Sequence, residues 1–516
     1  MYKVSAFYFM LGNVVPKDRS RLHTIYLVAL CFSTATKRCG FREVLRPLIN
    51  DLTLLAQQGL LIERTDVTMT LHGALCAVVA DNLAAHSIGG FFESFSSMHP
   101  CRFCLIRKDK LSIEFVCNEA YVRTADCYDS QVAFVSHDQS LQSLYGLKQN
   151  SVLNDVPYFH IACGLPSDIM HDLLEGVVCD VIECVLKHFV STGKISLQFV
   201  NLQIEKFPYV GSDKRNKPDV LTEVSKVRQT AAKTRCFLQL LPLMIGYKIP
   251  PSEPKWEVLL SLLNIHDLAF APVLTEGDTF VLDEYVELFL RNFHQEFATE
   301  TVKPKMHYLV HYGRQCRTFG ALIQFWSFRF EGKHGYFKEL TSRLKCRRNI
   351  LLTLAKKHQY HQSWRLNCSG PYLHDSNTLE CRGQLVMVTS LPGHLLSLIH
   401  SVVGESEHIF QATCVTVDGL KYESGLVVVT AVENHEPHLA IITSLFVIDR
   451  KLYIVASQLD NQEYCRHFHC YTGKLSSTFT LLTVGQLADP FPVSVYSAHH
   501  GVLCVLLKHH ICSGDC

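Results

Sequence analysis

Two short motifs, far apart in the chain, place the strongest constraint on how it folds. The string MHPCRFCLIRK contains Cys101 and Cys104, a C-x-x-C knuckle whose two thiolates can reach one metal ion. The string VKPKMHYLVHYGR contains His307 and His311, which stand four apart and therefore share one face of a predicted helix. Because a tetrahedral site needs four ligands, we expect the two motifs to meet around one ion.

Two other interpretations of these motifs stay open at the level of sequence. His160 and Cys163 lie nearer to the knuckle along the chain and offer the same ligand types. The four residues of the two motifs are otherwise ordinary core residues, since a free cysteine behaves as a small hydrophobic side chain.

Composition narrows the compartment and the class of protein. The chain has 516 residues, with 21 Cys and 27 His at irregular spacing and no secretion signal before them. This usage is typical of reduced thiols, so we expect a nuclear or cytoplasmic protein that is not secreted. No apolar run approaches the roughly 20 residues of a membrane helix, so no membrane partner is expected. The formal net charge is +1, so any nucleic-acid surface must be local.

The secondary-structure pattern predicts an α/β fold with a separate C-terminal part. Strands are predicted over residues 2–11 and 23–32, a helix over 42–58, and a long buried strand over 69–80. The predicted domains are a core with the Cys knuckle (1–165), a helical insertion (166–300), a segment completing the core (301–365) and a small all-β domain (383–516). In the last domain, Asp449-Arg450 separates two β-rich runs as a hairpin turn would.

Acidic residues at special positions are the candidates for catalysis. Asp81 ends the predicted strand over 69–80, and Glu331 lies in the aromatic and basic string WSFRFEGKHGYFK. Each also has a structural interpretation, as a turn residue for Asp81 and as a salt-bridge partner for Glu331. In SDIMHDLLEG, the residues Asp168, His171 and Asp172 are candidates for a supporting role beside a metal site, or for an acidic cluster at a helix start.

Two basic stretches are candidates for contact with phosphate groups. Residues 206–235 and 329–348 each carry a net charge of +5, which suits a nucleic-acid backbone. The predicted DNA-binding residues of the second stretch are Lys333, Lys338, Arg343, Lys345, Arg347 and Arg348.

An ordered set of strings resembles the transposases of the CACTA (En/Spm-like) DNA transposon superfamily, in their animal form. The strings are VSAFYFMLGNV, VLRPLINDL, VADNLAAHSIGGF, HPCRFC, DIMHDLLEGVV, PKMHYLVHYGR and FEGKHGYFK. They occur in the family's order and span residues 2 to about 358. The C-terminal β domain carries none of them.

The resemblance implies an RNase H-like core with acidic residues that hold two Mg²⁺ or Mn²⁺ ions for DNA strand cleavage and transfer. Asp81 then corresponds to the second acid and Glu331 to the third. Cys101, Cys104, His307 and His311 correspond to a split structural zinc site.

One part of the family pattern has no counterpart here. The resemblance places Met1 after the first strand and its Asp, so we expect a truncated core without that strand and with lost or incomplete cleavage. The expected partner is DNA, with self-association left open and no small-molecule substrate. The competing hypothesis is a non-catalytic, zinc-stabilised scaffold that contacts other proteins through its C-terminal β domain.

Overall fold

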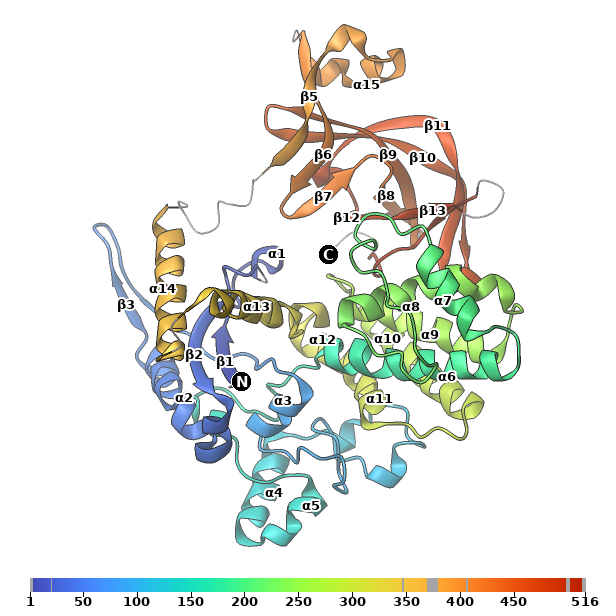
Figure 1. The fold of residues 1–516 in the computed structure, drawn as a ribbon. Helices are drawn as coiled ribbons and strands as arrows, with labels where there is room; N and C mark the ends of the chain where they lie inside the picture. Colours follow the sequence, from blue (N-terminus) through green and yellow to red (C-terminus); the bar gives the residue numbers. More distant parts are fainter. Residues whose placement is uncertain are drawn as a thin grey trace. The chain divides into compact units, whose positions relative to one another are not determined.

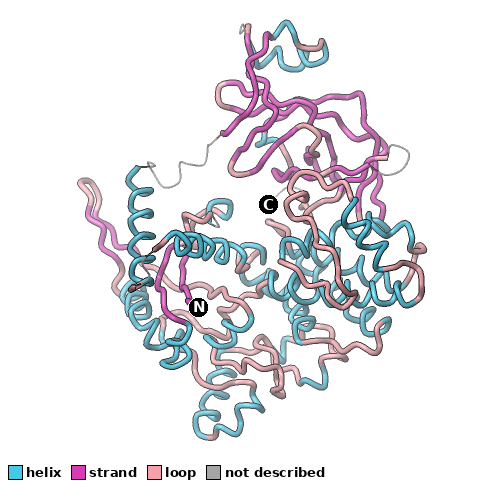
Figure 2. Tube along the Cα trace, viewed as in Figure 1, coloured by secondary structure: helices cyan, strands magenta, loops and turns pink. Residues whose placement is uncertain are grey.

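The computed structural model describes residues 3–19, 21–345, 348–368, 379–404, 407–497 and 502–512. The chain forms a mixed α/β protein with a large helical region and a C-terminal antiparallel sheet (Figures 1 and 2). It divides into two compact units, each built from two stretches of sequence. The first unit is Met1–Leu173 with Thr299–His374, and the second is Leu174–Ala298 with Asp375–Cys516.

The first unit combines helices, short strands and long loops. Its strands are β1 (Val4–Phe9), β2 (Tyr26–Phe32), β3 (Leu60–Glu63) and β4 (Thr68–Leu71). Its helices are α1 (Pro16–Arg19), α2 (Ser33–Gln57), α3 (Asn82–Ile88), α4 (Ala125–His137), α5 (Gln142–Tyr145), α11 (Pro304–Tyr308), α12 (Tyr312–Phe319), α13 (Phe328–Arg343) and α14 (Ile350–Cys368). Much of α2, α3 and α4 packs around one core that includes Leu45, Phe91 and Tyr128.

The predicted N-terminal strands form an antiparallel pair, β1 with β2, in which Val4 faces Phe32. Because a two-stranded ribbon is only marginally stable alone, it needs a packing partner. That partner comes from the other end of the unit, where Leu27 of β2 packs with Phe337 of α13 and Leu354 of α14. The sheet therefore joins the two sequence stretches of the first unit.

The predicted buried strand over 69–80 is wrong. Only Thr68–Leu71 is a strand, and it pairs with β3 in an exposed hairpin. The rest of the run lies outside the strands, and Val78 donates its amide to the carbonyl of Gly164, 2.8 Å away. Its apolar side chains, including Leu75 and Ala80, pack against the core around α2 instead. The prediction rested on apolar composition, but a strand also needs a neighbouring strand with which to form a ladder of hydrogen bonds.

The second unit contains a helical part and the antiparallel sheet. The helices are α6 (Val178–Ser191), α7 (Leu197–Lys206), α8 (Ala231–Ile245), α9 (Pro254–Ala269), α10 (Glu276–Glu296) and α15 (Gly393–Val403). The strands are β5 (Glu380–Met387), β6 (His408–Val417), β7 (Leu420–Glu423), β8 (Val427–Glu433), β9 (Glu436–Ile448), β10 (Lys451–Cys465), β11 (Cys470–Thr483), β12 (Asp489–Val493), β13 (Val495–Ser497) and β14 (Leu503–Val505).

The sheet is a half-barrel with the order β12-β8-β9-β10-β11-β14-β13, and β6 joins β9 to β5 and β7. The predicted hairpin between β9 and β10 is confirmed, with Ile448 paired to Lys451. Its two turn residues, Asp449 and Arg450, have φ of 48° and 61°. Left-handed backbone at both positions is what a two-residue hairpin turn requires.

A buried ion pair links the helical part of the second unit to the segment after β14. The Lys508 ammonium lies 2.7 and 2.9 Å from the two carboxylate oxygens of Asp213, and Tyr496 donates its hydroxyl to the same carboxylate at 2.7 Å. The two charged side chains are only 19% and 5% exposed.

No helix among the described residues is long and apolar enough to cross a membrane.

Removing one partner of this ion pair should destabilise the second unit strongly. Asp213→Ala leaves the Lys508 charge buried without its partner, which typically costs about 3 to 5 kcal/mol. Urea unfolding followed by circular dichroism measures the change. The double variant Asp213→Ala with Lys508→Met should recover much of the loss, and equal stability of single and double variants would contradict the assignment.

Candidate metal centre and acidic site

The four residues of the two predicted metal-binding motifs meet in the interior of the first unit. Cys101, Cys104, His307 and His311 are all buried, and one ligand atom from each lies within 4.8 Å of the others. The Sγ of Cys101 is 3.5 Å from Nε2 of His311, and the Sγ of Cys104 is 3.2 Å from Nε2 of His307. The two Nε2 atoms are 3.3 Å apart. The group suits a structural metal ion.

The local backbone structure of both segments positions the four side chains close to one another. In the knuckle, the amide of Phe103 donates to the Sγ of Cys101 at 3.3 Å. On the other segment, α11 begins at Pro304, a favourable residue for the first turn of a helix. The helix tightens into a 3-10 turn over Leu309–His311 rather than continuing as predicted. The two His rings nevertheless remain neighbours, with centroids 5.0 Å apart.

The electrostatics of the group also suit a cation. Burial opposes ionisation of Cys101, but the hydrogen bond with Cys104 and the neighbouring His311 hold the pKa of Cys101 well below its usual value. The hydrogen bond with Cys101, together with burial, raises the pKa of Cys104. Burial lowers the pKa of His311 and so favours the neutral ring that binds metals. Loss of a first proton is therefore favoured at Cys101 and opposed at Cys104.

Cys117 supports the metal group and was not predicted. Its Sγ lies 3.4 Å from Nδ1 of His311, the ring nitrogen that does not face the other ligands. Such a contact fixes the orientation of a ligating imidazole. No spacing in the sequence points to Cys117, because it acts only through the folded position of His311.

The alternative ligands His160 and Cys163 lie elsewhere. His160 pairs with Asp129, with 3.2 Å between Nε2 and Oδ1, and Cys163 is exposed. Among the residues that the structure describes, a second group of metal-ligand type consists of Asp278, His510 and Cys512 in the second unit.

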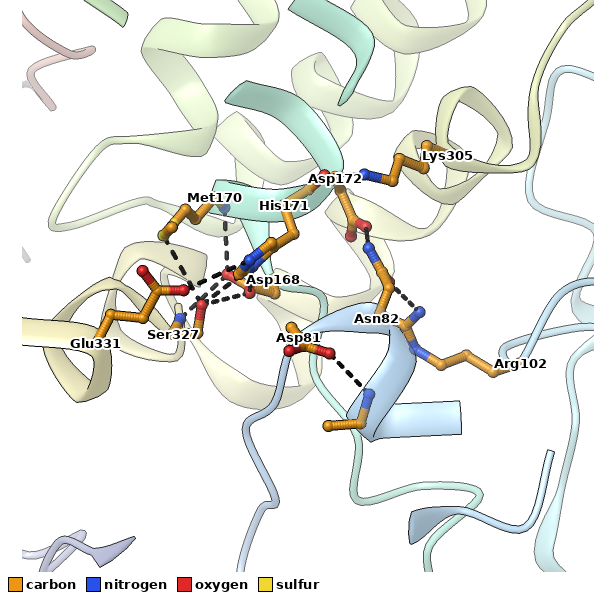
Figure 3. Close-up of polar contacts among 11 residues, drawn as sticks. Asp81, Asn82, Arg102, Asp168, Met170, His171, Asp172, Lys305, Ser327 and Glu331 are labelled. Carbon is orange, nitrogen blue, oxygen red and sulfur yellow. Dashed lines mark hydrogen bonds and ion pairs between the residues drawn. The ribbon is translucent and has the colours of Figure 1, made fainter. Parts of the chain in front are cut away.

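A buried polar network starts at the knuckle. The Arg102 side chain is 1% exposed and stacks on the ring of Tyr308, with 4.7 Å between its Cζ atom and the centroid. It donates to Oδ1 of Asn82 at 2.6 Å, and Asn82 in turn donates to Oδ1 of Asp172 at 2.6 Å. Lys305 donates to the carbonyl of His171 at 2.7 Å. This network ties the metal-binding segments to α3 and to the segment that carries Asp172 (Figure 3).

Asp168 is the centre of a second polar group, shown in Figure 3. Its Oδ2 accepts from the Ser327 hydroxyl and from Nδ1 of His171, both at 2.6 Å, and its Oδ1 accepts from the amides of Met170 and Ser327. Nε2 of His171 lies 3.5 Å from Oε1 of Glu331. Asp168 is therefore saturated with donors and orients His171 toward Glu331.

The remaining acidic candidates differ in exposure. The Glu331 side chain is 55% exposed, whereas Asp172 is fully buried. Asp81 is exposed, and its carboxylate accepts from the amide of Ala84 at 2.7 Å, so it caps the start of α3. The Asn82–Asp172 hydrogen bond holds the sequence around Asp81 next to the sequence around His171. Within the described residues, neither Asp81 nor Glu331 belongs to a compact group of three metal ligands.

The predicted DNA-binding residues fall into three groups. Lys338, Arg343, Lys345 and Arg348 are exposed, and Arg343 forms an ion pair with Glu339 one turn away. Arg347 lies outside the described residues. The prediction that Lys333 binds DNA is wrong, because Lys333 is only 6% exposed and donates to the carbonyl of Leu22 at 2.8 Å. Burial lowers its pKa to about 8, so Lys333 is not available to a phosphate backbone.

In the other basic stretch, residues 206–235, some cations have partners within the second unit. Lys226 pairs with Glu223, and Lys233 pairs with Asp219. Arg235 is half-buried and donates to the carbonyl of Lys508 at 2.6 Å. The two ion pairs use acids that the net charge of +5 already counts, and Lys206, Lys214 and Arg215 of the stretch are exposed.

The sequence matches no model of a known protein family. It also matches no curated protein.

The metal group makes a direct prediction about bound metal. Replacing Cys104 by Ser together with His311 by Ala removes two of four ligands, so bound metal should fall by about one equivalent per chain. Elemental analysis of purified protein measures this. The matched control, His160→Ala with Cys163→Ser, should keep the metal, and loss in the control but not in the first variant would reassign the site.

Asp172 predicts a specific pH dependence of stability. Burial raises its pKa from 3.8 to about 6, against the opposing effects of Arg102 and Asn82. Between these values the folded chain holds a proton that the unfolded chain has released, so stability falls as pH rises from about 4 to 6. The Asp172→Asn variant does not lose stability in this way. The free energy of unfolding of the variant, minus that of wild type, should therefore rise by roughly 2 to 3 kcal/mol between pH 4 and 7.5.

Denaturant unfolding of both proteins at the two pH values tests the prediction. A constant difference would show that Asp172 does not titrate in this range.

Proposed function

We propose that this chain is a transposon-derived, DDE transposase-like protein that binds DNA and does not by itself complete the two-metal cleavage site. The proposal rests chiefly on the meeting of the C-x-x-C knuckle with His307 and His311. In the resembling transposases, a split zinc site of this kind joins a helical insertion to an RNase H-like core. Glu331 follows His311 along α12 and α13, in the order that this resemblance expects.

Zinc is the ion that we propose for the metal group. With bonds of about 2.3 Å to sulfur and about 2.0 Å to nitrogen, tetrahedral zinc holds adjacent sulfur and nitrogen ligands about 3.5 Å apart and two nitrogens about 3.3 Å apart. The sulfur–nitrogen distances here are 3.5 and 3.2 Å, and the nitrogen–nitrogen distance is 3.3 Å. Four protein ligands leave no open position, so the role of the zinc is structural.

The acidic residues support a weakened or absent cleavage activity. Two ions about 4 Å apart need several oxygen ligands that bridge or flank them. Asp81 and Glu331 are exposed, but Asp168 already accepts four hydrogen bonds and Asp172 is fully buried. Among the described residues, neither of the two accessible candidates, Asp81 and Glu331, belongs to a compact group of three metal ligands.

Positive charge on and after α13 supports DNA binding. Residues 340–374 contain seven Lys and Arg and no Asp or Glu. Of the predicted contacts in this region, Lys345 and Arg348 are exposed. A local field of this kind attracts a phosphate backbone even though the whole chain is nearly neutral.

A scaffold that binds other proteins is the second candidate function. Strand β5 lies at an edge of the C-terminal sheet. Among the strands that the structure describes, it pairs with β6 alone. Leu385 and Met387 on this strand are 68% and 55% exposed. An exposed apolar edge strand is a ready site for another chain. This candidate predicts no affinity for DNA.

DNA binding should depend on salt through the exposed cations. Changing Lys338, Lys345 and Arg348 to Gln removes up to three phosphate contacts, so the slope of log affinity against log salt should flatten by up to about 2.7. Fluorescence anisotropy with labelled duplex DNA at several salt concentrations measures the slope. The matched control changes Arg450, Lys451 and Lys474, exposed on the C-terminal sheet, and should leave it unaltered. Equal slopes in all three proteins would leave the scaffold as the better account.

The chain should not nick supercoiled DNA in the presence of Mg²⁺ or Mn²⁺. The reason is that, among the described residues, neither Asp81 nor Glu331 belongs to a compact group of three metal ligands, whereas two ions need several shared oxygen ligands. Gel electrophoresis of plasmid DNA compares the wild type with Glu331→Gln. Metal-dependent nicking by the wild type that disappears in the variant would contradict the proposal of an incomplete site.

A further inference from the structure

Helix α14 presents an exposed face that mixes aromatic rings with positive charge. Tyr360 is 71% exposed and Trp364 is 59% exposed. Lys356 and Lys357 are exposed on the same helix. Residues Lys356, Tyr360 and Trp364 are each four positions apart, so they line one face at intervals of about 6 Å along the axis.

The opposite face of α14 explains why the helix keeps this orientation. Leu354 packs with Leu27 and Phe337. His358 stacks on Phe337, with 5.5 Å between ring centroids, and Gln362 donates to the carbonyl of His23 at 3.0 Å. These contacts fix α14 against β2 and α13 (Figure 1). The aromatic face is therefore held outward by packing on the other side.

The Trp364 ring is also positioned by a stack of rings. His361 lies between Tyr336 and Trp364, with centroid distances of 5.9 and 6.2 Å and interplanar angles of 19° and 20°. Burial, together with the charges of Arg365 and Lys333, lowers the pKa of His361, so its ring is neutral near pH 7. Trp364 ends this stack while more than half of its surface stays exposed.

We propose that the exposed face of α14 binds unpaired nucleotides of single-stranded DNA, with bases stacked on Tyr360 and Trp364 and phosphates held by Lys356 and Lys357. Every base has an aromatic face that stacks on such rings, but the faces are accessible only where the bases are unpaired. The absence of acidic residues over 340–374 makes the charge of this surface complementary to a nucleic-acid backbone. A protein partner would not require that complementarity.

This inference rests on the proposed DNA-binding function and adds a strand preference to it. The structure offers two separable sets of residues. Lys338, Lys345 and Arg348 contact phosphates of either duplex or single strand, whereas Tyr360 and Trp364 contribute only where bases are unpaired. The chain should therefore bind a junction or a melted end better than an uninterrupted duplex.

Trp364 provides a direct reporter for the test. The chain has three Trp, of which Trp256 is fully buried. Oligothymidylate should quench the tryptophan fluorescence of the wild-type chain. In Trp364→Phe, which keeps an aromatic ring, most of that quenching should disappear while the affinity measured by anisotropy stays within about twofold.

Loss of both rings should weaken single-strand binding selectively. The variant Tyr360→Ala with Trp364→Ala should lose about 10-fold or more in affinity for oligothymidylate, while its affinity for a blunt duplex is unchanged. The matched control is Tyr121→Ala, which removes a 44% exposed ring elsewhere in the first unit and should bind like the wild type. Near-ultraviolet circular dichroism verifies that each variant is folded.

The outcomes separate this inference from the proposed function. Duplex and single-strand affinities that both stay unchanged in the double variant would overturn the role of α14 and leave DNA binding in place. An equal loss for both ligands would overturn the strand preference. A wild-type chain that binds neither DNA would overturn the inference and the proposed function together.

Discussion

The meeting of the C-x-x-C knuckle with His307 and His311 is the constraint on which the rest of the first unit depends. The four ligands come from two segments of that unit that are far apart in the sequence, and helices α6 to α10 of the second unit come between them in the chain. Closing such a long loop costs conformational entropy, and packing two thiols with two imidazoles away from water is unfavourable without a compensating charge. Structural zinc contributes on the order of 10 kcal/mol in zinc-finger peptides, as much as the whole stability of a typical domain.

The four residues of the metal group are connected to the acidic site by a chain of polar contacts. Arg102 follows a metal ligand and stacks on Tyr308, which follows another. Its hydrogen bond to Asn82 fixes the residue directly after Asp81, and Asn82 holds Asp172. Displacing the knuckle therefore displaces the start of α3 and the segment that orients His171 toward Glu331. On this account the metal positions the acidic residues without touching them.

Sequence reasoning succeeded where a property is local. The ligand spacings of C-x-x-C and of His307 with His311, the β1 and β2 strands and the turn at Asp449-Arg450 all follow from neighbouring residues. It failed where a residue depends on a partner far along the chain. In the apolar run over 69–80, only the first residues, up to Leu71, pair with another strand. The ammonium group of buried Lys333 donates a hydrogen bond to the carbonyl of Leu22, far away in the sequence. The contact of Cys117 with His311 and the two hydrogen bonds from Ser327 to Asp168 belong to the same class, since only the folded chain brings these residues together.

X-ray absorption spectroscopy at the zinc edge tests the central claim most directly. It measures the elements bound to the ion and their distances in the intact chain, independently of any effect on folding or DNA binding. The account predicts two sulfur atoms at about 2.3 Å and two nitrogen atoms at about 2.0 Å, with one sulfur lost in Cys104→Ser. A first shell of oxygen and nitrogen alone, or of four sulfur atoms, would contradict it.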